Sequence, residues 1–570
     1  MTDSVGQPRI AGGGDVAAAR FEAWTRGARA YVLIALLAIA AALPGAFSVP
    51  PLDRDESRFA QATTQMLETG DFVRIREQEH ARNKKPIGIY WLQAASVSLF
   101  SNADARAIWA YRLPSVLGAV IASLATLWAG RSLFEKRAGL FAAALLASSV
   151  LLSTEGMIAK TDAMLCGVTT LAMAALAKLY VGRADKVTAR VFWIALAMGV
   201  LIKGPITPLV AGLTMATLAL WERRTAWMAP LLIPSGILLA LLLTLPWFVS
   251  IQLATHGQFL HDSMGVDLGR KLGGGDEGHA APPGYYLLLL PFLAFPISTA
   301  LPSGAAFVWK NARENAKSVA SPARFLAAWA APTWLVFEAL PTKLFHYNLP
   351  VYPALALAAA AGLVLGSGTE KRRWPRIALF AVAIIALASV GGFVAAQTPN
   401  WAPAAVCLAT LTMALVIAYT RAPNAIAAAA IAIASSLTLM TITRAVILPS
   451  TASWFVSAQA STQLARVGLH PRLSPGAGRL ISVGYAEPSF VFLTRTDTIL
   501  ATPQVAAALA QPSAAIIVEG RNRSALESAL AARRFMFVPR GAPIDGFNYS
   551  NHRTVSLQPG RVAPIAASPR

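Results

Sequence analysis

The sequence predicts a mainly α-helical protein that crosses a membrane about thirteen times and ends in a soluble α/β domain. Composition is the first indication: 55% of the 570 residues are hydrophobic and 14% are charged, against about 25% charged in a typical soluble protein. Apolar runs of roughly 20 residues, long enough to cross a bilayer, are the second. They recur as far as about residue 447, and shorter strand-like runs follow.

The formal net charge of +21 raises the question of nucleic-acid binding. Its distribution argues against that class, because the basic residues form short clusters between apolar runs, as the positive-inside rule requires. Part of the excess charge also suits anionic lipid headgroups. Both cysteines, Cys166 and Cys407, lie inside apolar runs, which disfavours a disulfide framework, a zinc site or a thiol-redox site.

The elements follow in order from the N-terminus. Residues 1–28 are polar and form the expected cytoplasmic lead, and 31–47 form an uncleaved first span. The later spans are expected at 113–134, 138–153, 163–181, 190–203, 205–221, 228–250, 284–303, 324–340, 350–367, 376–395, 402–420 and 424–447. Basic clusters mark every second connection, whereas the connection around Asn400 has none. This asymmetry places the N-terminus inside and the C-terminus outside.

Residues 29–449 therefore form the expected membrane domain, and 51–112 form its first outer loop. In this loop the pattern predicts a helix over 55–67 that ends at Gly70. The apolar stretch 87–100 is too short to cross the membrane comfortably and predicts a helix lying in the membrane surface. The loop also carries seven basic residues on the outer side, which we attribute to attraction of phosphate groups.

Residues 450–570 form the expected outer α/β domain. Strands are predicted at 479–483, 490–493, 514–518 and 535–538, helices at 505–509 and 524–533, and a disordered tail from Gly560 onward.

Two groups of residues in the first loop carry the functional prediction. Asp53, Asp55 and Glu56 open the loop, either as a helix N-cap or as carboxylates that act as a base or steady a developing positive charge. Lys84 and Lys85 precede Pro86 and the interface residues Tyr90 and Trp91; they either snorkel or bind a lipid phosphate.

Further candidates lie on the same outer face. Asp162 caps a span or adds a second acidic residue to the site, and Lys203, before Gly204 and Pro205, snorkels or faces the cavity. Weaker candidates are Arg270 in a glycine-rich loop, Lys343 and Tyr347 in a proline-rich loop, and His261 and His279 as metal ligands. Taken together, these residues place acidic, basic and aromatic groups on one side of the membrane.

Read in order, the motifs resemble those of the GT-C superfamily of polyprenyl-phosphate-dependent glycosyltransferases. The nearest resemblance is to bacterial 4-amino-4-deoxy-L-arabinose lipid A transferases and protein mannosyltransferase-like proteins. The resemblance covers most of residues 30–365 and rests on DRDESRFAQATTQML (53–67), NKKPIGIYW (83–91), KTDAML (160–165), LIKGP (201–205), LPWF (245–248) and TKLFHYNLPVYP (342–353). The run GYAEPSFVFL (484–493) is similar to the outer domain of the aminoarabinose transferases.

The resemblance implies an enzyme of the bacterial inner membrane that transfers a sugar from an undecaprenyl-phosphate donor on the periplasmic face, with lipid A or another envelope molecule as acceptor. It implies that Asp55 is the catalytic aspartate and Asp162 the second acidic residue, and that Lys85 meets the donor phosphate. Glu56, Lys84, Tyr90, Lys203, Arg270, Lys343 and Tyr347 complete the expected substrate site. Related chains often carry an acidic residue where this one has Lys84, so a divalent metal is left open as a cofactor.

Three rivals stay open at this point, and one of them is a non-catalytic scaffold with a periplasmic binding domain. A membrane transporter would place ionisable residues at mid-span, whereas here they gather at the outer ends of the spans. Within the same superfamily, a hexose or uronic acid could be transferred to a glycan, lipid or protein.

Overall fold

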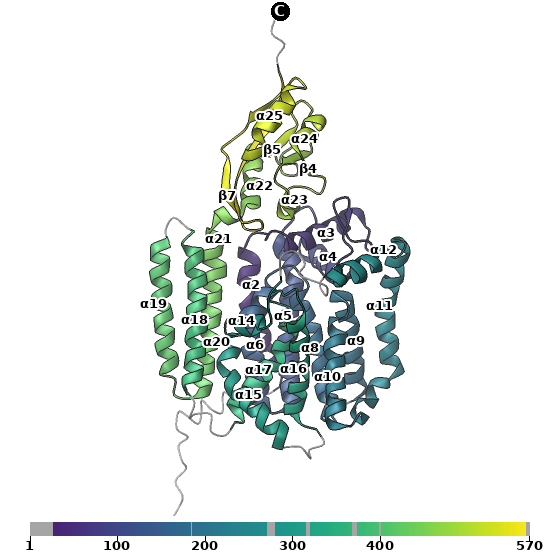
Figure 1. Cartoon of the computed structure of the whole chain (residues 1–570), viewed down its shortest axis with the longest axis vertical. Coiled ribbons are helices and arrows are strands. Elements are labelled where there is room, and N and C mark those ends of the chain that lie inside the picture. The colour runs from purple at the N-terminus through teal and green to yellow at the C-terminus, as the bar shows by residue number, and fades with distance from the viewer. Residues whose placement is uncertain are drawn as a thin grey trace, which may run out of the picture.

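The computed structural model describes residues 27–183, 185–270, 280–314, 320–366, 373–397 and 401–565. Its apolar helices stand side by side as a bundle, and a smaller sheet domain from the C-terminal part of the chain stands on one end of it (Figure 1). The predicted fold class, a multi-pass helical membrane protein with a C-terminal α/β domain, is therefore confirmed.

Helices of the bundle have bounds close to those expected. They are α2 (Gly27–Ser48), α5 (Ile108–Leu133), α6 (Lys136–Ala147), α7 (Val150–Gly156), α8 (Asp162–Tyr180), α9 (Lys186–Lys203), α10 (Ile206–Glu222), α11 (Pro234–Ala254), α14 (Tyr285–Leu293), α15 (Ile297–Glu314), α16 (Pro322–Ala339), α17 (Tyr352–Val364), α18 (Arg373–Ala395), α19 (Trp401–Thr420) and α20 (Ala425–Ile442). Shorter helical turns at the ends are η1 (Ala226–Leu232), α12 (Gln258–Leu260), η2 (His261–Leu268), η4 (Leu349–Val351), η6 (Thr443–Ile447) and α21 (Leu448–Ser450).

The number of membrane spans differs from a simple count of apolar runs. Within the described ranges, seven helices are long and apolar enough to cross a membrane, or up to nine if each of two bent pairs is one span. The pairs are α6 with α7, bent by 60°, and α14 with α15, bent by 117°. The expected number of thirteen spans is thus not confirmed.

Glycines bring α5 and α8 into close contact at the centre of the bundle. A Cβ atom on Gly118 of α5 would lie 2.4 Å from the backbone of Met164, and one on Gly167 of α8 would lie 2.6 Å from the carbonyl oxygen of Gly118. Small residues allow such close backbone approach between membrane helices. Since Asp162 is the first residue of α8, this contact helps to fix the position of its carboxylate.

The first outer loop folds over the end of the bundle. It contains α3 (Asp55–Thr69), strands β1 (Arg76–Glu77) and β2 (His80–Ala81), and α4 (Gly88–Phe100). The predicted helix 55–67 is confirmed, and Gly70 ends it in the left-handed conformation at φ 69°. Phe59, Ala62 and Met66 form the buried face of α3. In α4, Gly88 packs so closely on α9 that a Cβ would lie 2.8 Å from the carbonyl oxygen of Leu201.

The C-terminal domain is a mixed sheet covered by helices on both faces. Its elements are η7 (Ala452–Trp454), α22 (Val456–Arg466), β3 (Leu480–Val483), α23 (Pro488–Leu493), β4 (Ile499–Ala501), α24 (Pro503–Leu509), β5 (Ala515–Glu519), η8 (Gly520–Asn522), α25 (Arg523–Ala531), β6 (Phe535–Pro539), β7 (Ile544–Asn548) and β8 (Arg553–Pro564). The strand order is β4-β3-β5-β8-β6, with β7 also paired to β8. β3 runs parallel to β4 and β5, whereas β8 runs antiparallel to its partners.

Two predictions for this domain were wrong. The run 490–493, expected as a strand, belongs to helix α23, because Pro488 stands in the first turn, where its fixed φ favours a helix. The first part of the tail expected to be disordered, residues 560–564, is instead the end of β8, which pairs with β5 and β6, and residues 566–570 lie outside the described residues. The other predicted strands and helices of the domain are confirmed within about two residues.

Candidate active site

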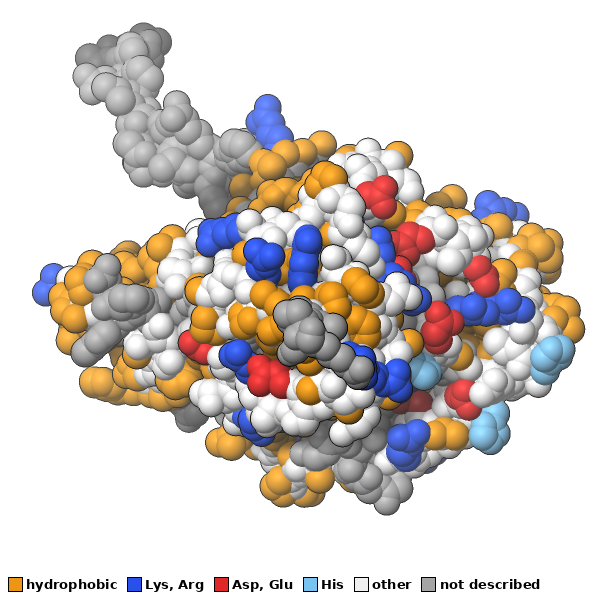
Figure 2. Space-filling view, turned by 90° about the horizontal axis from the view of Figure 1, so that it is seen from above, with side chains coloured by type: hydrophobic (Ala, Val, Ile, Leu, Met, Phe, Trp, Pro, Cys, Tyr) orange, Lys and Arg blue, Asp and Glu red, His pale blue; other side chains and the backbone are white. Residues whose placement is uncertain are grey.

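A cavity of about 510 Å³ opens at the end of the bundle that faces the C-terminal domain. Its walls come from the start of α3, the segment before α4, the α7–α8 and α9–α10 connections, the α11–η2 region and the segment between α16 and η4. Seen from above, the molecule carries acidic and basic side chains interspersed with hydrophobic ones, and hydrophobic side chains also cover much of the periphery (Figure 2).

One part of the cavity wall is charged. Asp55, Lys84, Lys85, Asp162 and Lys203, all predicted site residues, line it together. Lys85 Nζ lies 3.3 Å from a carboxylate oxygen of Asp267 on η2. The prediction that the first loop, the start of α8 and the end of α9 converge in space is therefore met by the geometry.

Another part of the wall is apolar. It is formed by Leu165, Ile206, Phe248, Phe259, Leu260, Phe337, Leu340 and Pro350. A cavity lined by both cationic and apolar side chains suits a ligand with an anionic head and an apolar tail.

Asp55 is the exposed one among the carboxylates that line the cavity. Its side chain is 62% exposed, and one of its oxygens lies 3.9 Å from the guanidinium of Arg58. The alternative that this acidic cluster serves as a helix cap is wrong, because the cap position is Arg54 and no side chain caps α3. The same holds for Asp162, since the cap of α8 is Thr161 and also has no side-chain hydrogen bond.

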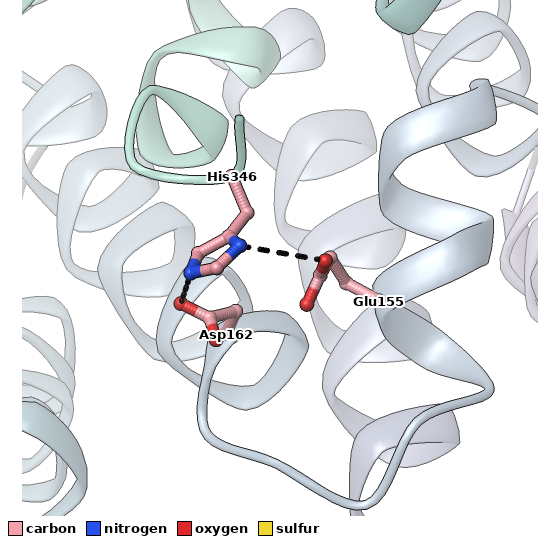
Figure 3. Close-up of side chains that lie close together, drawn as sticks. All are labelled: Glu155, Asp162 and His346. Carbon is pink, nitrogen blue, oxygen red and sulfur yellow. Dashed lines mark ion pairs between the residues drawn. The ribbon is translucent and has the colours of Figure 1, made fainter. Parts of the chain in front are cut away.

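Asp162 instead belongs to a buried network of charges. It lies 2.5 Å from Lys203 Nζ and 3.8 Å from Lys160 Nζ, and Lys160 Nζ lies 2.9 Å from Glu155. His346 stands between the two carboxylates: its Nδ1 is 3.8 Å from Glu155 and its Nε2 is 3.6 Å from Asp162 (Figure 3). This arrangement connects α7, α8, α9 and the loop before η4.

Burial lowers the pKa of His346 well below its usual range, despite the opposing effect of Asp162. The ring is therefore neutral near pH 7 and can donate from one nitrogen only. For Lys160, burial alone would lower the pKa, but Glu155 and Asp162 outweigh it and the net shift is upward. Lys160 thus stays charged beside Glu155 and Asp162.

Glu155, Asp162 and His346 also form a group that, by distance, could hold a metal ion, since their ligand atoms lie within 4.8 Å of one another. The chemistry of the surroundings does not fit a divalent cation. Lys160 and Lys203 already lie 2.9 and 2.5 Å from oxygens of Glu155 and Asp162, and these two amines would repel a divalent cation.

Three predicted site residues are buried behind the cavity wall and do not line it. Glu56 is buried and pairs with Arg112, at 2.7 and 2.8 Å. Tyr90 is buried and its hydroxyl accepts from Arg82. Lys343 is buried too, and its Nζ donates to the carbonyl oxygens of Ala281 and Leu340. These side chains shape the walls instead of facing the cavity.

Of the remaining candidate residues, one lines the cavity and the others do not line it or lie outside the described residues. Tyr347 lines the cavity, and Lys203 Nζ lies 5.2 Å from the centre of its ring. Arg270 is exposed and does not line the cavity. His261 is exposed, with Asp262 beside it at 3.3 Å, and does not join the cluster of Glu155, Asp162 and His346. His279 lies outside the described residues.

Sequence reasoning did not single out Lys160 and His346 as site residues, although both line the cavity. Lys160 stands two residues before Asp162, and its proximity was the one available signal. His346 comes from a segment nearly two hundred residues further on, and no local pattern connects the two.

Comparisons with known proteins indicate the family and the fold. Residues 32–258 match the family model described as dolichyl-phosphate-mannose-protein mannosyltransferase. An undecaprenyl phosphate-alpha-4-amino-4-deoxy-L-arabinose arabinosyl transferase from Erwinia tasmaniensis is 27% identical over 340 residues. A protein of the same description from Pseudomonas fluorescens is 30% identical over 325 residues. The resemblance inferred from the motifs is confirmed.

The matched regions have clear limits. They cover 59% of this chain and 60% of the Erwinia protein, and 54% of this chain and 55% of the Pseudomonas protein. The fold extends further. The crystal structure of ArnT from Cupriavidus metallidurans bound to undecaprenyl phosphate matches with a TM-score of 0.75 at 17% identity, over 95% of this chain and 98% of that one. This chain therefore has the ArnT fold, including the C-terminal sheet domain.

Proposed function

We propose that this chain is a glycosyltransferase of the bacterial inner membrane that moves a sugar from a polyprenyl-phosphate donor to an acceptor on the periplasmic face. Transfer of aminoarabinose to a phosphate of lipid A is the first candidate. The observation that carries the proposal is a single cavity in which Asp55 meets a set of cations beside an apolar wall. Relatives named as aminoarabinose transferases, and a fold neighbour crystallised with undecaprenyl phosphate, support it.

The geometry suggests a role for each side chain. The prenyl tail of the donor lies along the apolar wall, and its phosphate meets Lys85. In the reaction, the bond between the sugar's anomeric carbon and the phosphate oxygen breaks, and the polyprenyl phosphate leaves with the electron pair. A bond then joins that carbon to the acceptor oxygen. Cations of the cavity stabilise the negative charge that grows on the departing phosphate.

Asp55 has two available roles. It accepts a proton from an acceptor hydroxyl, or it steadies the positive charge that develops on the sugar. A phosphate acceptor that is already ionised has no proton to lose, so the electrostatic role applies to lipid A. Asp162 is held by Lys203 and Lys160, which suits a carboxylate that orients these ammonium groups toward the cavity.

The proposal includes the domain organisation and the membrane topology of the chain. Residues 29–449 form the catalytic membrane domain, the loop 51–112 and the cavity face the periplasm, and residues 450–570 form a periplasmic domain. The N-terminal lead, residues 1–28, is cytoplasmic.

Lys84 favours a second candidate within the same class. It adds a positive charge to the cavity wall. A cationic amino sugar is less suited to such a wall than a neutral or acidic sugar. The alternative is therefore transfer of a hexose or uronic acid to a glycan, lipid or protein.

Mass spectrometry of lipid A and of envelope glycans, from cells with and without the gene, tests the proposal. Aminoarabinose transfer predicts that lipid A loses one sugar mass per modified phosphate when the gene is removed. Unchanged lipid A, together with a change in another envelope glycan, would favour the second candidate. Identical lipid A and glycans in both strains, with the gene expressed, would contradict both.

A further inference from the structure

The turn immediately before Asp55 is held in an unusual conformation. Arg54 has φ 60° and ψ −111°, a region that residues with a Cβ rarely adopt. Such a conformation persists only where the surroundings impose it, and it is typical of functional sites. The question is which contacts impose it here.

Contacts from the C-terminal domain hold the turn on one side. The hydroxyl of Tyr549, in the β7–β8 connection, accepts a hydrogen bond from the Asp53 amide at 2.7 Å. Ser489 of α23 donates to the Asp53 carboxylate, and Arg54 donates to the carbonyl oxygen of Ser550. The two residues before Asp55 are thus bound by two segments of the outer domain. These segments follow the turn in the chain by 436 and 496 positions.

Contacts from the membrane domain hold the other side. Glu56 accepts from the amide of Leu52 at 2.9 Å and from the amide of Ala159 at 2.7 Å, and it pairs with Arg112. The residues before Asp55 are therefore held by hydrogen bonds from the C-terminal domain, and the residue after it is held by contacts with the bundle. Among the described residues, the Asp55 side chain makes one ion-pair contact, with Arg58 at 3.9 Å.

We propose that Ser489 and Tyr549 of the C-terminal domain are positioning residues for the reaction: they hold the Asp53–Arg54 turn and thereby fix the carboxylate of Asp55 in the cavity. This inference rests on the proposed glycosyltransferase function and gives the C-terminal domain a part in it. The domain acts through the backbone of the turn, because its hydrogen bonds end on Asp53 and Arg54 and none reaches Asp55 in the described residues.

The surroundings of Asp53 also give this coupling a pH dependence. Burial raises the pKa of Asp53 to about 7, and Glu487 adds to the rise, whereas the hydrogen bond from Ser489 and the charge of Arg54 lower it. Tyr485 and Tyr549 are titratable groups that interact with this carboxylate, and Glu56 interacts with Tyr549. Removing the Ser489 hydroxyl therefore raises the pKa of Asp53 further.

The experiment compares Tyr549→Phe and Ser489→Ala with the unaltered full-length protein in lipid nanodiscs. Ser528→Ala is the matched control, because Ser528 is exposed on α25 and remote from the turn. We expect kcat for sugar transfer to fall on the order of 10- to 100-fold in both variants while KM for the donor stays unchanged, since a small displacement of a reacting group costs this much. In Ser489→Ala, the acidic limb of the plot of kcat against pH should move to higher pH, because the pKa of Asp53 rises.

Hydrogen–deuterium exchange of the segment 52–58 gives a readout that does not depend on catalysis. Tyr549→Phe should increase exchange there, because the Asp53 amide loses its acceptor. If the unaltered protein is active, two results would overturn the coupling without affecting the proposed function. One is unchanged exchange in Tyr549→Phe, and the other is a rise in KM with unchanged kcat. No transfer by the unaltered protein from any polyprenyl-phosphate sugar would overturn the proposed function, and with it the catalytic meaning of the coupling.

Discussion

Lys85 is the residue to which the proposal assigns the donor phosphate. Its ammonium group lines the cavity and lies 3.3 Å from Asp267, so its position is defined before any ligand binds. A hydrogen bond to a charged group contributes about 1.5–3 kcal/mol. Lys85→Ala should therefore lower kcat/KM for the donor by roughly 10- to 100-fold, mainly through KM.

Initial rates at varied donor concentration measure this effect. Lys85→Arg should keep part of the activity because it keeps the charge. Lys136→Ala, an exposed lysine at the start of α6, should behave like the unaltered protein. An unchanged KM in Lys85→Ala would show that the phosphate binds elsewhere.

Glu56 and Arg112 form the ion pair that connects the first loop to the bundle. Both side chains are 1% exposed, and Arg112 also donates to the backbone carbonyls at Ala46, Val49 and Pro50. Removing one partner of a buried pair leaves a charge without compensation and costs about 3–5 kcal/mol. Glu56→Gln should therefore lower the melting temperature markedly, as measured by thermal unfolding in detergent.

Glu135→Gln serves as the control for that measurement, because Glu135 is exposed at the start of α6 and makes no capping hydrogen bond. Equal melting temperatures for the two variants would mean that the pair does not hold the loop. The sequence alone suggested a substrate role for Glu56, since nothing in the local pattern indicates a partner 56 positions away.

At the scale of elements, the crossing of α5 and α8 depends on glycine. Gly118→Ala would place a methyl group 2.4 Å from the backbone of Met164, where no flexible side chain can yield. We expect α8 to shift, Asp162 to move with it, and both melting temperature and transfer rate to fall. Gly212→Ala on α10 meets nothing within 4 Å and should leave both unchanged or raise stability slightly. Wild-type stability and rate in Gly118→Ala would disprove this packing argument.

Elements with a clear pattern were predictable from the sequence, and those defined by distant partners were not. The amphipathic spacing of 55–67 and the glycine after it sufficed for α3. The run 490–493 is short and continuously apolar, so its periodicity does not separate strand from helix. The second half of β8 carries Pro559, Gly560 and Pro564, and only the pairing with β5 and β6 makes it a strand.

The same distinction applies to the candidate site. Asp55, Lys85, Asp162 and Lys203 lie next to turns and span ends, where a charged residue attracts attention in the sequence. His346 joins Asp162 and Glu155 only because α7, α8 and the segment before η4 meet in the folded bundle. Long-range contacts of this kind leave no periodic signal in a single sequence.

On the scale of the whole molecule, the contact between the C-terminal domain and the bundle should respond to pH. The pKa of Asp53, raised from 3.8 to about 7 by burial, means that the folded protein holds a proton that the unfolded chain has lost. Between these two values, stability therefore falls as pH rises. Unfolding temperatures from pH 4.5 to pH 8 should show this decline, and Asp53→Asn should flatten it. Parallel curves for the two proteins would contradict the assignment to Asp53.

The central claim is that one cavity takes a polyprenyl-phosphate sugar and passes the sugar on with the help of Asp55. The most direct measurement is reconstitution of the purified protein with undecaprenyl-phosphate aminoarabinose and lipid A, read by mass spectrometry. The account predicts that lipid A gains one aminoarabinose and that Asp55→Asn slows this gain by about 10²–10⁴-fold, with the exposed Asp104→Asn as an active control. Equal rates in Asp55→Asn and the unaltered protein would contradict it, as would no transfer from this donor or from any other polyprenyl-phosphate sugar.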